Sequence, residues 1–200
     1  MPTNRNGRKN SETARKMIYA SFFAALIFLA TAYLPRIPTS LGYVHLGDGF
    51  ILLAASILPT PYALAASAIG GSLADLLTGY AVWAPGTFVI KALMALCISS
   101  RTKRMTSPRN IIGIIPASLI NAGGYYLFQS LLISGNFIAA LPEIPFNIIQ
   151  TVVGGVVFVV VGALMEQTSA IKNMLPNGGR GESPERVSRS ENQQKDENTK

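Results

Sequence analysis

Apolar stretches alternate with short polar segments along most of the chain, and the polar segments are rich in Pro, Gly and charged residues. The apolar stretches cover residues 17–34, 46–58, 62–79, 87–100, 111–133 and 143–165. An apolar helix of about 20 residues crosses the hydrocarbon core of a bilayer, which is about 30 Å thick. The pattern therefore predicts an all-α polytopic membrane protein, built as a bundle of six transmembrane helices.

The run at 46–58 is short for a span. At about 1.5 Å per residue, a helix of this length covers only about 20 Å. The run closes at Pro59 and Pro61. It predicts either a tilted span that begins in the preceding loop or half of a re-entrant hairpin, which would leave four spans. We favour six.

The two ends of the chain differ from its middle in composition. Residues 1–16 form a basic arm, residues 17–165 form the predicted membrane domain, and residues 166–200 form a polar tail. The low hydrophobicity of this tail is typical of disordered segments. The arm is polar for too long to resemble a cleaved signal peptide, so the first span should direct insertion.

The distribution of Lys and Arg predicts the orientation, because cytoplasmic loops carry an excess of both. With six spans, the arm, the loop at 101–110 and the tail fall on one side of the membrane. That side holds all 17 basic residues except Arg36 and Lys91. Both termini are therefore predicted to be cytoplasmic, and four spans would give the same result.

Composition narrows the classes of function. The chain is 49% hydrophobic and 14% charged, whereas a typical soluble domain is about 25% charged. The net charge of +7 does not indicate nucleic-acid binding, because the basic residues border apolar runs. The single cysteine, Cys97, and the single histidine, His45, exclude an intramolecular disulfide and a His-rich metal site. We expect no metal and no cofactor.

Three ionisable residues, Asp48, Asp75 and Lys91, interrupt the apolar runs. A charge inside the bilayer costs about 3 kcal/mol or more, so such groups usually face a partner charge or a cavity. The predicted topology places Lys91 about 9 Å and Asp75 about 6 Å from the outer ends of consecutive helices. A buried Asp75–Lys91 ion pair is therefore predicted, either as a purely structural contact or as part of a ligand site.

Uncharged polar residues recur at helical spacing in the last two spans. Asn121, Tyr125 and Gln129 are separated by four residues each, and Asn147 and Gln150 by three, so each set shares a helix face. All lie toward the outer side in the predicted topology. Amide and phenol groups suit a neutral heterocyclic or hydroxylated molecule. The alternative is that they only form hydrogen bonds between helices.

Asp48 lies in the segment VHLGDG before the second run, between two glycines. It could cap the helix that follows, or belong to a lid over an outer pocket. Elsewhere, Ala20 and Ala24 in the first span and Ala66 and Gly70 in the third have the small-xxx-small spacing of closely packed helices.

Motifs of catalysis and nucleotide binding are absent: the chain contains no GxxxxGK[ST], no HExxH and no GxSxG. The chain therefore cannot hydrolyse ATP itself, and we do not expect an enzyme. Six spans without an inverted repeat are also few for a self-sufficient transporter.

The run from residue 44 to residue 96 resembles the substrate-capture, or S, components of energy-coupling factor (ECF) vitamin transporters. The resemblance is carried by LGD, ADLLTGY, TFVIKAL and, in the last span, PFNIIQ. It is strongest to the riboflavin and hydroxymethylpyrimidine type branch. The short second run and the long charged tail do not map onto the family pattern.

The resemblance implies a six-helix subunit of the bacterial cell membrane that binds a water-soluble vitamin or precursor from outside. The expected ligand is a vitamin or precursor of the riboflavin, hydroxymethylpyrimidine, pyridoxine or pantothenate class. It also implies docking on a transmembrane coupling subunit driven by two cytoplasmic ATPases. The family's AxxxA docking motif in the first helix is matched by Ala20 and Ala24.

The family pocket is formed by the loop after the first helix and the outer halves of helices four to six. The residues expected in the site are Asp48, Lys91, Asn121, Tyr125, Gln129, Asn147 and Gln150. An autonomous transporter that uses Asp75 and Lys91 for proton coupling is the alternative function. A small membrane enzyme is least favoured, since no nucleophile and base cluster in the sequence.

Overall fold

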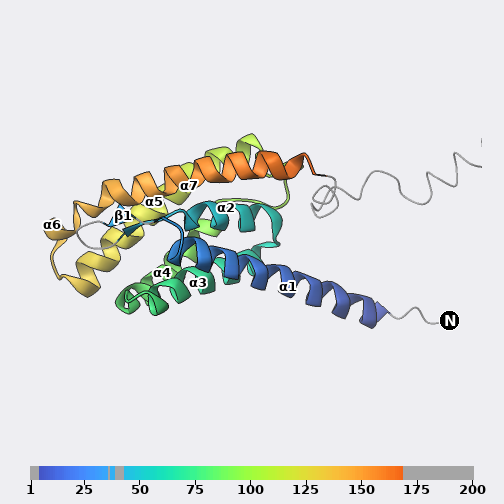
Figure 1. The fold of residues 1–200 in the computed structure, drawn as a ribbon, viewed down its shortest axis with the longest axis horizontal. Coiled ribbons are helices and arrows are strands. Elements are labelled where there is room, and N and C mark those ends of the chain that lie inside the picture. Colours follow the sequence, from blue (N-terminus) through green and yellow to red (C-terminus); the bar gives the residue numbers. More distant parts are fainter. Residues whose placement is uncertain (1–4, 36, 39–42, 169–200) are drawn as a thin grey trace, which may run out of the picture.

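The computed structural model of the protein describes residues 5–35, 37–38 and 43–168 (Figure 1). Six helices of more than ten residues lie within this part of the chain. They are α1 (Arg5–Ala32), α2 (Gly47–Ile57), α3 (Thr60–Leu77), α4 (Ala84–Leu96), α5 (Pro108–Phe128) and α7 (Glu143–Glu166). Each corresponds to one predicted apolar run, so the all-helical prediction is confirmed. The predicted tail beyond residue 168 lies outside the described residues.

Short elements connect the long helices. A 3-10 turn (Ala81–Trp83) precedes α4, a π-helical turn (Gln129–Ile133) extends α5, and α6 (Phe137–Ala140) precedes α7. The strands β1 (Ile37–Pro38) and β2 (Tyr43–Val44) form an antiparallel ladder two residues long. This ladder brings the chain back from α1 to the start of α2.

Among the described residues, three helical segments are long and apolar enough to cross a membrane: Asn10–Ala32, Pro108–Ile133 and Phe137–Glu166. The segments Gly47–Ile57 and Ala81–Leu96 are apolar but shorter. Large apolar side chains cover the outside of the bundle, such as Ile18, Leu119 and Leu164, each at least 60% exposed. Such a surface fits contact with lipid better than contact with water.

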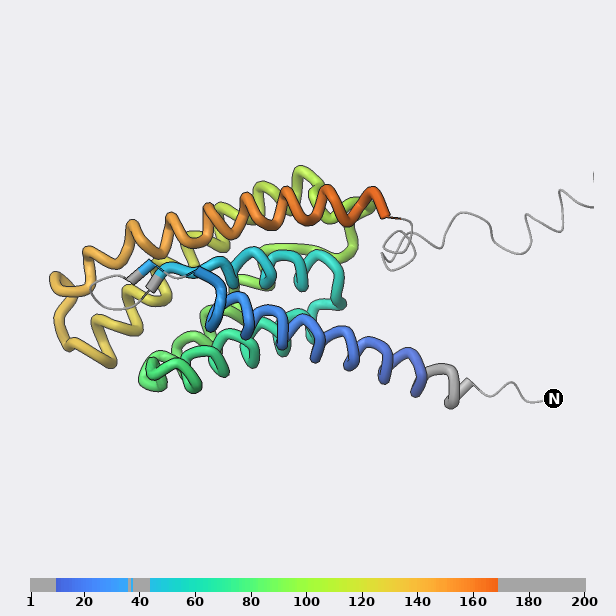
Figure 2. The backbone as a smooth tube through the Cα atoms, in the orientation of Figure 1, coloured from blue at the N-terminus to red at the C-terminus, as the bar shows by residue number. Residues whose placement is uncertain are grey.

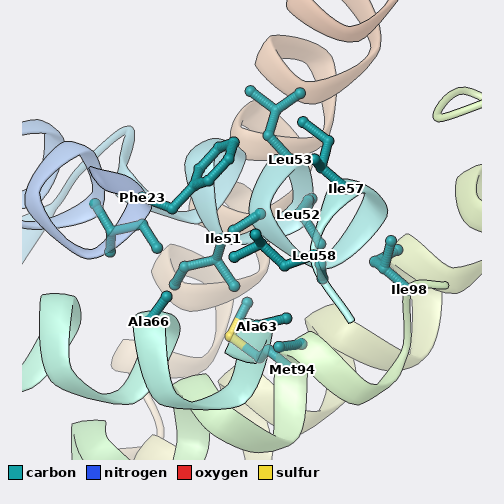
Figure 3. Close-up of a cluster of buried hydrophobic side chains, with 14 of the residues drawn as sticks. Phe23, Ile51, Leu52, Leu53, Ile57, Leu58, Ala63, Ala66, Met94 and Ile98 are labelled. Atoms are coloured by element: carbon teal, nitrogen blue, oxygen red, sulfur yellow. The ribbon is translucent and has the colours of Figure 1, made fainter. Parts of the chain in front are cut away.

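Helix α2 occupies the middle of the bundle. Ile51 and Leu52 are fully buried, and Figure 3 shows Phe23 of α1, Ala66 of α3 and Met94 of α4 around this helix. A helix that is apolar on all sides is buried either in a protein core or in lipid, and here the other helices surround it. The short second run is therefore an inner helix, joined to α3 by a tight connection at Leu58 and Pro59.

The remaining helices flank α2. Helices α1 and α3 pack together, α3 packs on α4, and α7 packs on both α5 and α2. Figure 2 shows the N-terminal part of α1 extending past the bundle, at the end of the molecule where α7 finishes. The start of α1 and the end of α7 thus lie at one end of the structure.

Glycines set the spacing of two of these helix pairs. A Cβ atom at Gly154 of α7 would lie 2.8 Å from the backbone nitrogen of Gly49 in α2, and a Cβ at Gly70 of α3 would lie 2.6 Å from the carbonyl oxygen of Ala24 in α1. Neither approach is possible with a larger residue unless the backbones separate. The predicted close packing at Ala24 and Gly70 is confirmed.

Candidate substrate-binding site

A buried cluster of polar side chains joins the helices in the middle of the bundle. The ammonium group of Lys91 on α4 lies 2.6 Å from Oδ1 of Asp48 on α2. It also donates a hydrogen bond of 2.9 Å to Oδ1 of Asn121 on α5. Lys91 is 1% exposed and Asp48 is fully buried, so the ion pair is shielded from both water and lipid.

Helix α7 completes the cluster. Oδ2 of Asp48 accepts a hydrogen bond of 3.0 Å from Nε2 of Gln150 and one of 3.2 Å from Oγ1 of Thr151. Oε1 of Gln150 accepts from the backbone nitrogen of His45 at 3.3 Å. Because both carboxylate oxygens are satisfied, the cost of burying the Asp48 charge is reduced. Four helices thus converge on one ion pair.

The prediction that Asp48 caps the following helix is wrong. The N-cap position of α2 is Leu46, which makes no side-chain capping bond, and Asp48 lies within the first turn. Its side chain points into the bundle and is fully buried. The alternative, that this segment belongs to a lid over an outer pocket, stays a prediction. The close approach of Gly49 to Gly154 brings Asp48 within reach of α7.

The ion pair of Lys91 is with Asp48, whereas we expected Asp75 as the partner. The Asp75 carboxylate instead accepts a hydrogen bond from the hydroxyl of Thr87, one turn before Lys91 on α4. The residue of α3 that faces Lys91 is Gly71, one turn before Asp75: a Cβ there would lie 3.1 Å from Cγ of Lys91. Residue spacing predicts Asp75 and Lys91 at the same depth, but α3 is offset by one turn relative to α4, so Gly71 lies beside Lys91.

Tyr125 lies between these two polar groups. Its hydroxyl is 2.9 Å from Oγ1 of Thr87, and the ammonium of Lys91 is 5.2 Å from the centre of its ring. The ring of Trp83 packs against it at a centroid distance of 6.0 Å and an angle of 60°. Contacts with α4 and the preceding turn therefore fix both the ring and the hydroxyl.

The other two predicted residues are Asn147 and Gln129. The side chain of Asn147 donates to the carbonyl oxygen of Glu143 on its own helix, at 3.0 Å, while its backbone carbonyl accepts from Nδ2 of Asn121 at 3.1 Å. Gln129 is 1% exposed. Within the described part of the chain, its Oε1 has no hydrogen-bond partner. Gln129 is thus buried but not bonded to the cluster through that oxygen.

Sequence reasoning did not select the two threonines that complete these contacts, Thr87 and Thr151, as site residues. Threonine is common in apolar helices, so its presence alone gives no signal. The available signal was position: Thr87 precedes Lys91 by one turn, and Thr151 follows Gln150.

A second feature is an apolar groove on the outside of the bundle. It has a volume of about 690 Å³ and lies between residues 17–28 of α1 and 61–73 of α3. Ala20 and Ala24 both line it and are half-buried. Small side chains on both helices leave this face open.

The apolar exterior and the buried ion pair with its amide neighbours define a polytopic membrane protein with polar groups gathered inside a helical bundle. The chain belongs to the family of ECF-type riboflavin transporter S components, whose sequence model matches residues 11–167. This confirms the resemblance to ECF S components. The family is one of vitamin-binding membrane transport subunits and not of enzymes.

Two further proteins are similar to this chain. The solved structure described as "Structure and mechanism of the S component of a bacterial ECF transporter" matches with a TM-score of 0.64 and 21% identity, over 78% of this chain and 97% of that chain. At this identity the match shows the fold alone. An "Uncharacterized protein in gap 3'region" of Pyrococcus woesei is 30% identical over 119 residues, which is 59% of this chain and 78% of that protein.

Proposed function

We propose that this protein captures riboflavin, or a related water-soluble vitamin, at the outer face of the bacterial cell membrane. The observation that carries the proposal is the buried cluster in which Lys91, Asp48, Asn121 and Gln150 converge from four helices. A polar cluster of this kind inside an apolar bundle is expected to have a functional role, because its burial costs free energy.

The chemistry of the cluster suits a neutral heterocycle. Asn121 and Gln150 each offer both a donor and an acceptor, and the Tyr125 ring offers an aromatic surface. These groups bond to one another within the cluster, so a vitamin would exchange its own carbonyl, imino and hydroxyl groups for those internal bonds. The buried Oε1 of Gln129 is suited to accept from a ligand donor. Asn147 would contribute once its side chain leaves the Glu143 carbonyl.

Transport requires partners, because the chain has no nucleotide-binding motif. We propose that the groove at Ala20 and Ala24 docks on the transmembrane coupling subunit of an ECF transporter, which two cytoplasmic ATPases drive. The small side chains on both walls would admit the side chains of a partner helix. In this arrangement both termini and the basic loop at 101–110 face the cytoplasm.

The test is binding of riboflavin to the purified full chain in detergent, measured by quenching of the vitamin's fluorescence. We expect saturable one-to-one binding that Asn121→Ala abolishes, whereas Ser72→Ala, which removes a hydroxyl bonded to its own helix, leaves it unchanged. Mass spectrometry of copurifying molecules identifies the natural ligand. Absence of binding by riboflavin, hydroxymethylpyrimidine, pyridoxine and pantothenate would refute the proposal. ATP-independent uptake by the reconstituted chain alone, driven by a proton gradient, would favour an autonomous transporter.

A further inference from the structure

Asp75, Thr87 and Tyr125 form a chain of hydrogen bonds that crosses three helices beside the proposed site. The Thr87 hydroxyl bonds to Oδ2 of Asp75 on α3 and lies 2.9 Å from the Tyr125 hydroxyl on α5. Asp75 is 6% exposed and Thr87 is 2% exposed. The burial of these polar groups calls for a functional explanation, because these contacts do not join Asp75 or Thr87 to the Lys91 cluster.

The direction of the chain follows from the chemistry of its groups. A carboxylate only accepts hydrogen bonds, and a hydroxyl has one hydrogen to donate. Thr87 therefore donates to Asp75 and must accept from Tyr125. The Tyr125 hydroxyl is thus committed to Thr87, and Thr87 is held in turn by a charged acceptor, which makes that bond stronger than one between neutral groups.

These bonds fix the position of the Tyr125 hydroxyl. Rotation about the first side-chain torsion would move that hydroxyl away from Thr87. Rotation about the second torsion turns the ring on the axis that carries the hydroxyl, so the contact with Trp83 sets the plane of the ring. The same ring lies 5.2 Å from the Lys91 ammonium and 6.0 Å from the ring of Trp83. An aromatic surface that is already oriented before a ligand arrives loses less conformational entropy on binding, and this raises affinity.

We propose that Asp75 is a positioning residue for the vitamin: acting through Thr87, it holds the Tyr125 ring at the place where the heterocycle packs against it. This inference rests on the proposed function, because it concerns the affinity of the same site. Asp75 itself does not touch the ligand. Its effect reaches the site through the hydroxyls of Thr87 and Tyr125.

The experiment measures the Kd of riboflavin for the purified full chain and four variants. Asp75→Ala and Thr87→Val each interrupt the series of hydrogen bonds. Each should weaken riboflavin binding about tenfold, which corresponds to about 1.4 kcal/mol. Asp75→Asn keeps an acceptor and Thr87→Ser keeps the hydroxyl, so both should stay within about threefold of the unaltered protein. Thr87→Val preserves side-chain shape, so it tests the idea independently of any effect of Asp75→Ala on folding.

Two further readouts separate positioning from a general structural effect. The double variant Asp75→Ala/Thr87→Val should bind riboflavin no more weakly than either single variant, because both changes interrupt the same series of hydrogen bonds. Trp83 is the single tryptophan and contacts Tyr125, so its fluorescence reports the ring directly. It should change in Asp75→Ala and Thr87→Val and return in Asp75→Asn. Ser56→Ala, which removes a buried hydroxyl bonded within α2, is the matched control and should change neither readout.

The possible results are distinct. Unchanged affinity in both Asp75→Ala and Thr87→Val, or additive losses in the double variant, overturns the positioning role while leaving the proposed function intact. If the unaltered protein binds none of riboflavin, hydroxymethylpyrimidine, pyridoxine and pantothenate, the proposed function fails and the inference fails with it. Loss in the interrupting variants with recovery in Asp75→Asn and Thr87→Ser supports the inference.

Discussion

Replacing Lys91 by Met would leave the Asp48 carboxylate without its cation in the middle of the bundle. The two charged atoms are 2.6 Å apart, and the side chains are 1% and 0% exposed. Removing one partner of a buried ion pair costs about 3–5 kcal/mol, because the remaining charge stays desolvated and uncompensated. We expect Lys91→Met to lose about 3 kcal/mol of unfolding free energy, since Gln150 and Thr151 still donate to Asp48.

The matched variant is the double substitution Asp48→Asn/Lys91→Met, which removes both charges and keeps their approximate shapes. Replacing both partners of a buried pair is often neutral, so the double variant should regain most of the lost stability. Thermal and denaturant unfolding of the ligand-free protein in detergent measures both effects. Stability in Lys91→Met equal to that of the unaltered protein, or a double variant no better than the single one, would refute the reasoning.

Three other substitutions test separate parts of the structure. Gln150→Ala should weaken vitamin binding about tenfold, as measured by fluorescence titration, because it removes a donor to Asp48 and an amide from the proposed site; unchanged affinity would remove Gln150 from that site. Ala24→Phe should abolish uptake by the assembled transporter and spare vitamin binding by the isolated chain, because the side chain fills the groove that Ala24 lines; normal uptake would refute the docking role. Gly154→Ala should cost about 1–3 kcal/mol of stability, since its Cβ would lie 2.8 Å from the Gly49 nitrogen; Gly123→Ala, where a Cβ meets open space, is the control, and equal stability in both variants would contradict the packing argument.

The helices could be predicted from the sequence because each apolar run is bounded by Pro, Gly or charged residues. The run closed by Pro59 and Pro61, for example, ends as α2 at Ile57, and α3 begins at Thr60. The inner position of α2 could not be predicted, because a short apolar run has the same composition whether lipid or protein surrounds the helix. Only the packing of α1, α3 and α7 around it decides the case.

Several residues of the buried polar cluster could be predicted from the sequence, whereas their contacts could not. Helical spacing identified Asn121 and Gln150, and both bond to the ion pair. The partner of Lys91 could not be predicted, because residue spacing fixes depth along a helix but not its rotation or its offset against a neighbour. Asp48 lies 43 residues from Lys91 and 102 from Gln150 along the chain, so no local pattern connects them.

The charge balance of the cluster bears on which vitamin it accepts. Asp48 and Lys91 neutralise each other at 2.6 Å, and Asp75 places a second carboxylate beyond Thr87 and Tyr125. A neutral heterocycle can exchange hydrogen bonds here without adding charge, whereas the carboxylate of pantothenate would add an anion to a buried site that already holds two.

We therefore expect riboflavin bound to the purified protein to resist displacement by a hundredfold excess of pantothenate. Asp48→Asn should shift this preference toward pantothenate, because it leaves Lys91 as an uncompensated cation that attracts an anion. The measurement is competition against riboflavin fluorescence in both proteins. Equal displacement of riboflavin by pantothenate from the unaltered protein would show that the ion pair does not govern selection, and that the vitamin is recognised elsewhere in the bundle.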